Sequence, residues 1–550
     1  MSIASTITEA AISSRIARKC VDAGFAWYSG RRTRQIDRLS VANEQRDTLV
    51  RLVRTAKHTR FGHAHGFASI RSIADYQVQV PLRDYEAHWQ EFWQACYPNT
   101  QGVTWPERIP YFALSSGTTS GTTKYIPVSR AMLASNRKAA LTSLTWFRAA
   151  HPEVPLFTGR LFFLGGSTDL RHAGPASFAG DLSGIVTREA PALLAPFTFP
   201  PSDLALLSDW EEKLMRLAEQ SLKQPITMIS GVPSWLLVLF ERLKQITGKN
   251  SISDIWPTLR LVIHGGTSFA PYRNLFRQII GNDEVHFLET YPASEGFIAA
   301  QDHRFGMLRL IPDHDVFFEF VPVDELSHAQ PTRHTIAEVM PGVQYAVVLT
   351  TCAGLWSYVL GDTVCFESVD PPLLRFTGRT KYYLSAFGEH LINEEVECAI
   401  AQAATATGAA VTDFHVGPVF PGNANKPGWH RYLVEFARRP SDLDAFARLL
   451  DQSLGQSNED YAAHRAGDLT MLEPEVCQVE RGGFAAWMKS RGKLGGQHKL
   501  PRMDNGGQLT AEIFEWLVTH GLAANQNNRE RCRAKESLPF DRPVLEASTP

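Results

Sequence analysis

The sequence predicts an α/β fold for the larger N-terminal part of the chain and a smaller α+β domain after it. Apolar strand-like runs alternate with helical stretches, which is the pattern of strands connected by helices. One run, at 259–263, ends in His264-Gly265-Gly266 and indicates a sheet buried on both faces, with glycine at the edge where α/β folds bind ligands. The pattern then changes near Pro371-Pro372, where we place the boundary.

The elements follow this division in order. Helical patterns extend to about residue 60, and strands are predicted at 161–164, 261–263, 285–288, 316–323 and 344–350. After the boundary we predict helix 394–404, strand 410–416, a Pro/Gly/Asn loop at 417–428, strand 431–436 and helix 443–454. We therefore expect a large domain over 1–374, a small one over 375–524 and a flexible polar tail over 525–550.

Composition favours a small-molecule partner. The 550 residues carry a net charge of −2 with both signs interspersed, which gives no electrostatic footprint for nucleic acid or an anionic membrane. Seven scattered cysteines without a C-x-x-C pair argue against a disulfide framework and a structural zinc site. No apolar run reaches the roughly 18 residues of a membrane helix, and no secretory signal is evident, so we expect a cytoplasmic protein.

A hydroxyl- and glycine-rich loop indicates phosphate binding. It follows the apolar run 109–114 and reads Ser115-Ser116-Gly117-Thr118-Thr119-Ser120-Gly121-Thr122-Thr123-Lys124. Glycines let backbone N–H groups converge on an anion, hydroxyls add donors, and the lysine ammonium neutralises charge. The spacing differs from Walker A, which disfavours a kinase-like or motor-like loop. A plain surface turn is the alternative.

Two further turns carry carboxylates. One turn follows a predicted strand and reads Tyr291-Pro292-Ala293-Ser294-Glu295-Gly296. Glu295 is therefore expected at the same sheet edge as the phosphate loop, where its carboxylate could hold Mg²⁺. The run 355–362 is predicted to close a hairpin, and Asp362 could accept both hydroxyls of a ribose. The Glu295 turn, taken alone, is also compatible with a surface turn, and Gly361-Asp362, taken alone, favours an ordinary turn between strands.

The segment from Gly378-Arg379 through Gly388, His390 and Glu395-Val396-Glu397 resembles the hinge of adenylate-forming enzymes, which include acyl-CoA synthetases, nonribosomal adenylation domains and luciferase. Within that superfamily the chain is most similar to the auxin-responsive acyl-acid amido synthetases. Their Ser-Ser-Gly-Thr loop, Tyr-x-x-Ser-Glu turn and Tyr-x-x-Gly-Asp turn occur here in the same order. The resemblance covers roughly residues 50–505.

The resemblance implies roles for individual residues. Phosphates would bind at the Ser115–Lys124 loop, including Ser116, Gly117, Thr118 and Thr119. Tyr291 and Ser294 would belong to the ATP site, Glu295 would be catalytic and hold the metal, Asp362 would bind ribose, and Arg379 would bind the nucleotide near a hinge at 378–390. Lys499 matches the family's Gln-x-Lys-x-Pro-Arg lysine and would approach the α-phosphate. His390 stands where relatives more often carry lysine, so its charge would titrate near neutrality.

The resemblance also implies a reaction. The chain would use ATP and Mg²⁺ to adenylate a carboxylic acid in a large adenylation domain, and a mobile small domain would then expose a site for an amine, expected to be an amino acid. Alternatives are an acyl-CoA ligase, or a nucleotide-binding scaffold that has lost catalysis. The acid is expected near 131–147 and 232–240, where Trp146, Trp235 and Phe240 suit an aromatic or apolar acid or simply pack the core.

Three histidines close together in the sequence raise the question of a second metal site. His63 and His65 lie beside His58, but a stable site needs three or four ligands, and Gly62 and Gly66 mark a loop. We interpret these three side chains as structural.

Overall fold

The structure is a computed structural model of the chain. It describes residues 14–116, 123–165, 170–190, 192–205, 207, 210–266, 269, 272–380, 383–384, 386–387, 389, 391–420, 427–465, 471–492 and 500–523. Among the sequence-predicted site residues, Gly117, Thr118, Thr119, His390 and Lys499 lie outside these ranges.

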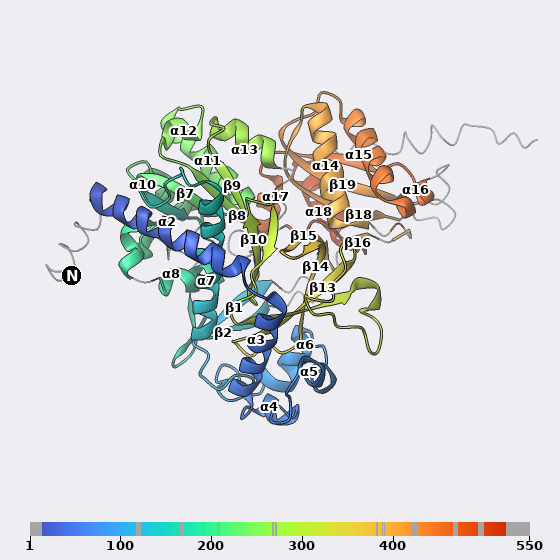
Figure 1. The fold of residues 1–550 in the computed structure, drawn as a ribbon. Helices are drawn as coiled ribbons and strands as arrows, with labels where there is room; N and C mark the ends of the chain where they lie inside the picture. The colour runs from blue at the N-terminus through green and yellow to red at the C-terminus, as the bar shows by residue number, and fades with distance from the viewer. Residues whose placement is uncertain are drawn as a thin grey trace, which may run out of the picture.

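A large mixed sheet forms the centre of the N-terminal part (Figure 1). Its strand order is β12-β13-β14-β15-β11-β10-β9-β8-β7-β3-β6. The strands are β3 Arg160–Phe163, β6 Thr198–Phe199, β7 Ile226–Gly231, β8 Leu261–Gly265, β9 His286–Pro292, β10 Phe297–Asp302, β11 Met307–Leu310, β12 Val316–Pro322, β13 Gln344–Thr351, β14 Tyr358–Val369 and β15 Pro372–Arg379. The α/β prediction is confirmed, and so are the strands predicted within 161–350.

The sheet changes character along its width. Strands β6, β3, β7, β8 and β9 pair in parallel, and from β9 to β12 every pairing is antiparallel. The central parallel strands β7 and β8 are almost fully buried because helices cover both faces. At the carboxyl end of β8, a Cβ on Gly265 would meet the Thr290 carbonyl oxygen of β9 at 2.4 Å, so only glycine fits there.

Helices and three smaller sheets complete the fold, the smallest of which pairs β16 Tyr383–Leu384 with β17 Leu391–Ile392. The main helices are α2 Arg15–Asp37, α3 Val41–Ala56, α5 Ile73–Gln79, α7 Arg130–Ala150, α8 Leu182–Arg188, α10 Trp210–Ser221, α11 Pro233–Thr247, α13 Arg273–Ile280, α14 Asn393–Thr407, α15 Leu443–Ser457, α17 Gly483–Ser490 and α18 Gln508–Thr519. A four-stranded sheet has the order β2-β1-β5-β4, formed by β1 Tyr111–Ser116, β2 Thr123–Val128, β4 Arg171–Gly174 and β5 Ser177–Gly180.

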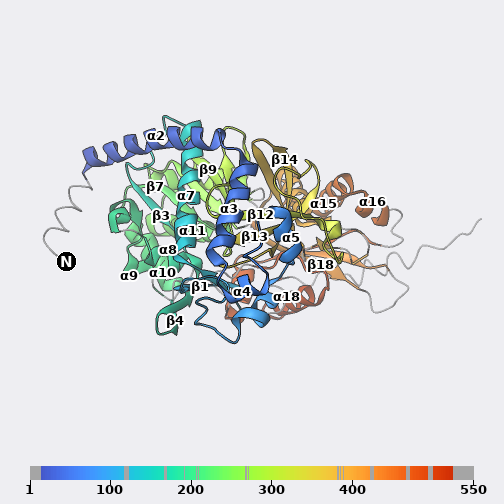
Figure 2. The ribbon, with the colours of Figure 1, turned by 60° about the horizontal axis from the view of Figure 1, so that its bottom comes forward.

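Helix α2 packs across α7 on the outside of the large sheet, as both ribbon views show (Figures 1 and 2). Buried Arg32 of α2 donates to Thr142 of α7 and forms an ion pair with Asp313 at 2.6 Å. Asp22 accepts backbone N–H groups from Leu156 and Phe157. The Arg32 contact fixes α7, which lies next to the candidate site, and the Asp22 contacts fix the segment that follows α7.

The C-terminal part has its own sheet, with the order β18-β19-β20. The strands β18 Ala410–Val419, β19 Trp429–Arg438 and β20 Glu475–Val479 pack their apolar side chains against α14 and α15. The strands and helices predicted here are confirmed as α+β structure. Division at residue 374 and a hinge at 378–390 stay predictions.

Two local predictions were wrong. Gly361-Asp362 does not turn a hairpin, because both residues lie inside β14 at a bulge where Gly361 has φ +88°. The turn comes earlier, at 352–357. Similarly, β9 continues to Pro292, so Tyr291 is a strand residue, and only 293–296 connect β9 to β10.

Within the described ranges, no helix is both long and apolar enough to cross a membrane.

Candidate active site

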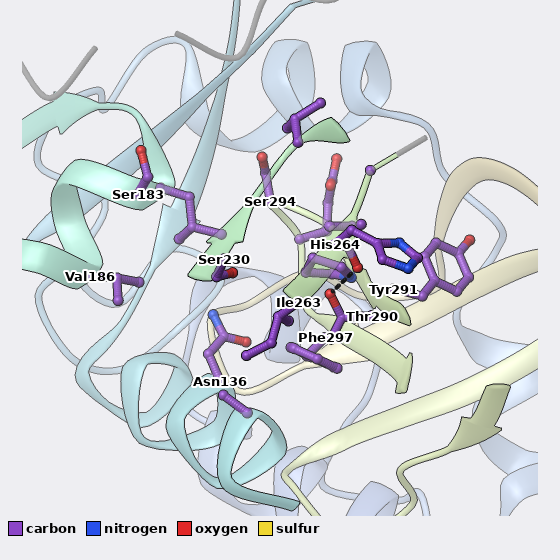
Figure 3. Close-up of a pocket in the computed structure, with 18 of the residues that line it drawn as sticks. Asn136, Ser183, Val186, Ser230, Ile263, His264, Thr290, Tyr291, Ser294 and Phe297 are labelled. Atoms are coloured by element: carbon purple, nitrogen blue, oxygen red, sulfur yellow. Dashed lines mark hydrogen bonds between the residues drawn. The ribbon is translucent and has the colours of Figure 1, made fainter. Parts of the chain in front are cut away.

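A cavity of about 1880 Å³ opens at the carboxyl ends of β7, β8 and β9. Its walls come from the β1–β2 hairpin, α7, α8, strands β14 and β15, and residues 500–502 of the C-terminal part. Figure 3 shows Asn136 of α7, Ser183 of α8 and Ser230 of β7 around it, with Tyr291 and Ser294 from the β9 side. The cavity is therefore built from segments that span most of the chain.

Glu295 lies on the wall of this cavity and is held by a tyrosine. The Tyr358 hydroxyl of β14 donates to Glu295 Oε1 at 3.0 Å, and both side chains are buried. Burial raises the pKa of the Glu295 carboxyl above its usual range, while the nearby Lys124 ammonium and the Tyr358 hydroxyl act against the rise. A carboxylate held in this way gains from a cation that binds beside it.

Asp362 has partners from two other strands. The Tyr291 hydroxyl donates to Asp362 Oδ2 at 2.9 Å, and Arg379 Nε lies 3.0 Å from Asp362 Oδ1. Burial, followed by the Asp362 charge, raises the pKa of Tyr291 well above its usual range, so the phenol stays a donor. Each carboxylate oxygen has a second lone pair, so Asp362 can accept further hydrogen bonds from a ligand.

Ser115 and Lys124 lie opposite each other at the loop end of the β1–β2 hairpin, and both line the cavity. The Lys124 ammonium lies 5.4 Å from the ring centroid of Tyr85, which is a cation–π contact. Residues Gly117 to Thr119 lie outside the described part of the chain, between these two flanks. The two ends of the predicted phosphate loop thus face the same space as Glu295.

Arg502 connects the C-terminal part to the cavity wall. Its guanidinium donates to Glu397 Oε1 of α14 at 2.7 Å and to the Tyr272 hydroxyl at 2.8 Å, and it stacks on Phe414. Leu500 and Pro501 line the cavity beside it. Lys499 is outside the described residues, but the residues immediately after it are at this wall.

The sequence reasoning missed several lining residues. Thr290 donates to the His264 carbonyl oxygen at 3.0 Å, shown by the dashed line in Figure 3. The His264 ring stacks on Phe269 at 3.8 Å, and burial lowers the pKa of His264 to about 3, so the imidazole is neutral. Burial also raises the pKa of Glu289. The only sequence signal for these residues was their position at strand ends.

The aromatic side chains proposed for an acid pocket separate into two groups. Trp235 lines the cavity, whereas Trp146 and Phe240 are fully buried in the core, where Arg309 stacks on Trp146. The packing explanation holds for these two. Small and apolar side chains of α7 and α8 line this side of the cavity instead, namely Leu133, Ala140, Ser143, Leu144 and Val186.

His58, His63 and His65 do not form a metal-binding group with one another within the ranges that the structure describes. His65 instead stacks on Phe61 at 4.0 Å and contacts Arg83. The structural interpretation fits these contacts.

Sequence comparison finds one family along most of the chain. The GH3 family N-terminal domain matches residues 37–174 and 172–285, the GH3 family central domain matches 309–379, and the GH3 family C-terminal domain matches 394–507.

Individual relatives are distant. Indole-3-acetic acid-amido synthetase GH3.3 of Arabidopsis thaliana is 26% identical over 34% of this chain and 33% of its own length. Putative indole-3-acetic acid-amido synthetase GH3.10 of Oryza sativa subsp. japonica is 24% identical over 63% of this chain and 80% of its own length. Jasmonoyl--L-amino acid synthetase JAR4 of Nicotiana attenuata is 26% identical over 54% of this chain and 62% of its own length. The matched part thus spans less than two-thirds of two of these three relatives.

Solved structures share the fold. GH3.15 acyl acid amido synthetase superposes with a TM-score of 0.71 at 17% identity, over 88% of this chain and 94% of that one. A 2-hydroxyisobutyryl-CoA ligase in its postadenylation state with 2-HIB-AMP superposes with a TM-score of 0.57 at 12% identity, over 86% of this chain and 91% of that one. The fold is thus common to enzymes named for an amide product and for a thioester product.

Proposed function

This chain belongs to the GH3 family, and we propose that it is an ATP-dependent ligase that adenylates a carboxylic acid and joins the acyl group to an amine. The named relatives are acid-amido synthetases, which supports an amide product with an amino acid as the amine. The convergence of the family's motifs on one cavity is the observation that carries this proposal.

The chemistry has two steps. A carboxylate oxygen attacks the α-phosphorus of ATP, the bond to the bridging oxygen breaks, and pyrophosphate leaves with its electron pair. The amine then attacks the acyl carbon of the mixed anhydride, loses a proton, and expels AMP. Such displacements depend on positioning and on stabilising charge at the phosphates.

We assign phosphate binding to the hairpin loop, with Ser115, Ser116, Gly117, Thr118 and Thr119 as donors and Lys124 as the cation. The position of both flanks at the cavity and the proximity of Lys124 to Glu295 support this assignment.

We assign Mg²⁺ to Glu295. The fit rests on its buried carboxylate, whose raised pKa reflects negative charge that the surroundings compensate incompletely. When bound, the ion would neutralise phosphate charge. Tyr358 keeps the Glu295 carboxylate oriented toward the cavity.

The remaining roles concern the nucleotide and the small domain. Asp362 would accept the ribose hydroxyls, with Tyr291 and Arg379 fixing its orientation, and Ser294 would lie beside the nucleotide. Lys499 would stabilise charge at the α-phosphate, and His390 would contribute a charge that depends on pH. After adenylation, rotation about 378–390 would withdraw Lys499 and admit the amine.

We further propose an apolar or aromatic acid and a cytoplasmic location. Trp235 and the apolar side chains of α7 and α8 on the cavity wall support the first. The six free thiols among the described cysteines support a reducing compartment.

Product analysis tests the ligase proposal. The chain would be incubated with ATP, Mg²⁺ and a panel of aryl, indolyl and fatty acids, with either mixed amino acids or CoA, and the products identified by mass spectrometry. An N-acyl amino acid supports the proposal. A thioester formed with CoA and no amide would assign the chain to the acyl-CoA ligases, whose fold it shares.

A further inference from the structure

Three histidines and a glutamate meet outside the cavity, at the C-terminal end of α7. His151 is the residue that caps this helix, and Glu153 follows it. His286 begins β9, and His303 comes directly after β10. Because β9 carries Tyr291 near its other end, this cluster and the nucleotide cavity lie at opposite ends of the strand.

The distances suit a single ion. One ligand atom from each of His151, Glu153 and His286 lies within 4.8 Å of the other two. His151 Nδ1 is 3.7 Å from Glu153 Oε1, and the rings of His151 and His286 have centroids 4.1 Å apart. Ligand atoms about 2 Å from one tetrahedral zinc ion lie about 3.4 Å apart, so small side-chain rotations bring these atoms to the spacing of a bound ion.

Hydrogen bonding fixes which nitrogen of His151 is free. His303 Nε2 lies 2.9 Å from the Phe287 carbonyl oxygen, which can only accept, so this nitrogen carries the proton. With Nε2 protonated, the neutral His303 ring presents its Nδ1 as an acceptor. His151 Nε2, 3.0 Å away, must therefore donate to it, so in the neutral imidazole tautomer that binds a metal the lone pair of His151 Nδ1 faces Glu153.

The backbone around the cluster is held in place. The His151 N–H donates to the Phe147 carbonyl, and Arg148 donates to the carbonyl oxygens of His151 and Val154. The Phe147 ring packs against all three imidazoles, with centroids 4.8 to 5.4 Å away. The imidazoles are thus positioned before any ion arrives, and His151 and Glu153, with side chains 24% and 69% exposed, leave access from solvent.

We propose that this cluster binds a divalent transition metal of the zinc class. The ligands are His151 Nδ1, an imidazole nitrogen of His286 and the Glu153 carboxylate, and solvent takes the fourth position. Two histidines and a glutamate form a recognised zinc donor set, and imidazole nitrogen excludes magnesium and calcium as preferred ions. His303 acts as the outer partner that orients His151.

The bound ion joins the end of α7 to the start of β9. Because the opposite end of α7 borders the acid side of the cavity, the metal stabilises the scaffold of that wall without touching the reacting atoms. The expected consequence is a rise in thermal stability.

Zinc titration of the full, metal-stripped chain tests the proposal. Isothermal calorimetry is expected to find one Zn²⁺ per chain, accompanied by a higher unfolding temperature. His286→Ala and the nearly isosteric Glu153→Gln should remove this binding, and His303→Ala should weaken it roughly 10- to 100-fold. The exposed His328→Ala, which lies outside the cluster, is the matched control and should bind like the wild type.

Cobalt gives a second readout, since a four-coordinate Co²⁺ complex absorbs visible light far more strongly than hydrated Co²⁺. The proposal fails if the wild-type chain takes up no zinc, or if His286→Ala and Glu153→Gln both retain its affinity and stoichiometry. The Glu153 side chain is largely exposed, so its substitution tests the site without threatening the fold.

Discussion

The Tyr358 hydroxyl donates to Glu295 Oε1 across 3.0 Å, joining a residue of β14 to the turn after β9 in a buried position. This bond orients the carboxylate that we assign to Mg²⁺ and favours its charged form.

Removing that hydroxyl should reduce activity and shift its pH dependence. In Tyr358→Phe the Glu295 carboxylate loses a donor that lowers its pKa, so the acid limb of kcat/KM should move to higher pH. A hydrogen bond to a charged group contributes about 2 kcal/mol, or roughly 30-fold in rate. Tyr345→Phe is the control, because its hydroxyl accepts the Met340 N–H in the core. Identical pH profiles for Tyr358→Phe and the wild type would contradict this role.

Glu295→Gln should be less active and more stable. The pKa of Glu295 in the folded state is raised above the ordinary 4.5. This carboxyl therefore adds to the free energy of unfolding at low pH, and the contribution is lost as pH rises through the folded-state pKa. At pH 7 to 8 the wild type therefore carries the cost of a buried charge that glutamine avoids. We expect the variant to melt higher at pH 8, with the difference shrinking toward pH 4, and to lose at least about 100-fold in activity. A variant that melts lower at pH 8 would refute this.

Arg502→Met should destabilise the chain. The substitution leaves buried Glu397 without its guanidinium partner and removes the donor to Tyr272. Breaking a buried pair from one side costs about 3–5 kcal/mol, which denaturant unfolding would measure. Arg439→Met, which breaks the exposed pair with Glu480, is the control and should change stability by no more than about 1 kcal/mol. Equal effects from the two variants would show that Arg502 is not a structural anchor.

Glu435 should make stability depend on pH in the C-terminal part. Burial raises the pKa of its carboxyl to about 6, although the Gly482 and Phe484 N–H groups donate to it. The Glu435 carboxyl adds about 2 kcal/mol to the free energy of unfolding below pH 4.5, and this contribution is lost as pH rises through 6. Unfolding of Glu435→Gln between pH 4 and 7 should lack this decline. The exposed Glu480→Gln should keep it, and a decline of equal size in both variants would exclude Glu435 as its source.

Regular elements were predictable where local pattern and tertiary role agree. The apolar runs that became β8, β12 and β13 are buried at all but a terminal residue of β8 and β13, so composition alone identified them. Gly361-Asp362 was misread because a Gly-Asp pair looks the same in a turn and in a bulge. Only pairing of β14 with strands on both sides distinguishes the two.

The candidate site was predictable as motifs, but its contacts were not. Sequence identified Glu295 and Asp362, yet their partners Tyr358 and Tyr291 were assigned no such bonds, because register between strands decides which side chains meet. Arg502 contacts Tyr272, 230 residues away in the sequence, and His151 contacts His303, 152 residues away. No local spacing encodes such distances.

Acid-dependent exchange between pyrophosphate and ATP is the most direct test of adenylation. It would be measured with Mg²⁺ across aryl, indolyl and fatty acids for the wild type, for Lys499→Ala and for the exposed control Lys57→Ala. We predict exchange with one class of acid that collapses in Lys499→Ala and persists in Lys57→Ala. Exchange that is independent of any acid, or that Lys499→Ala leaves unchanged, would contradict the proposed adenylating role of this site.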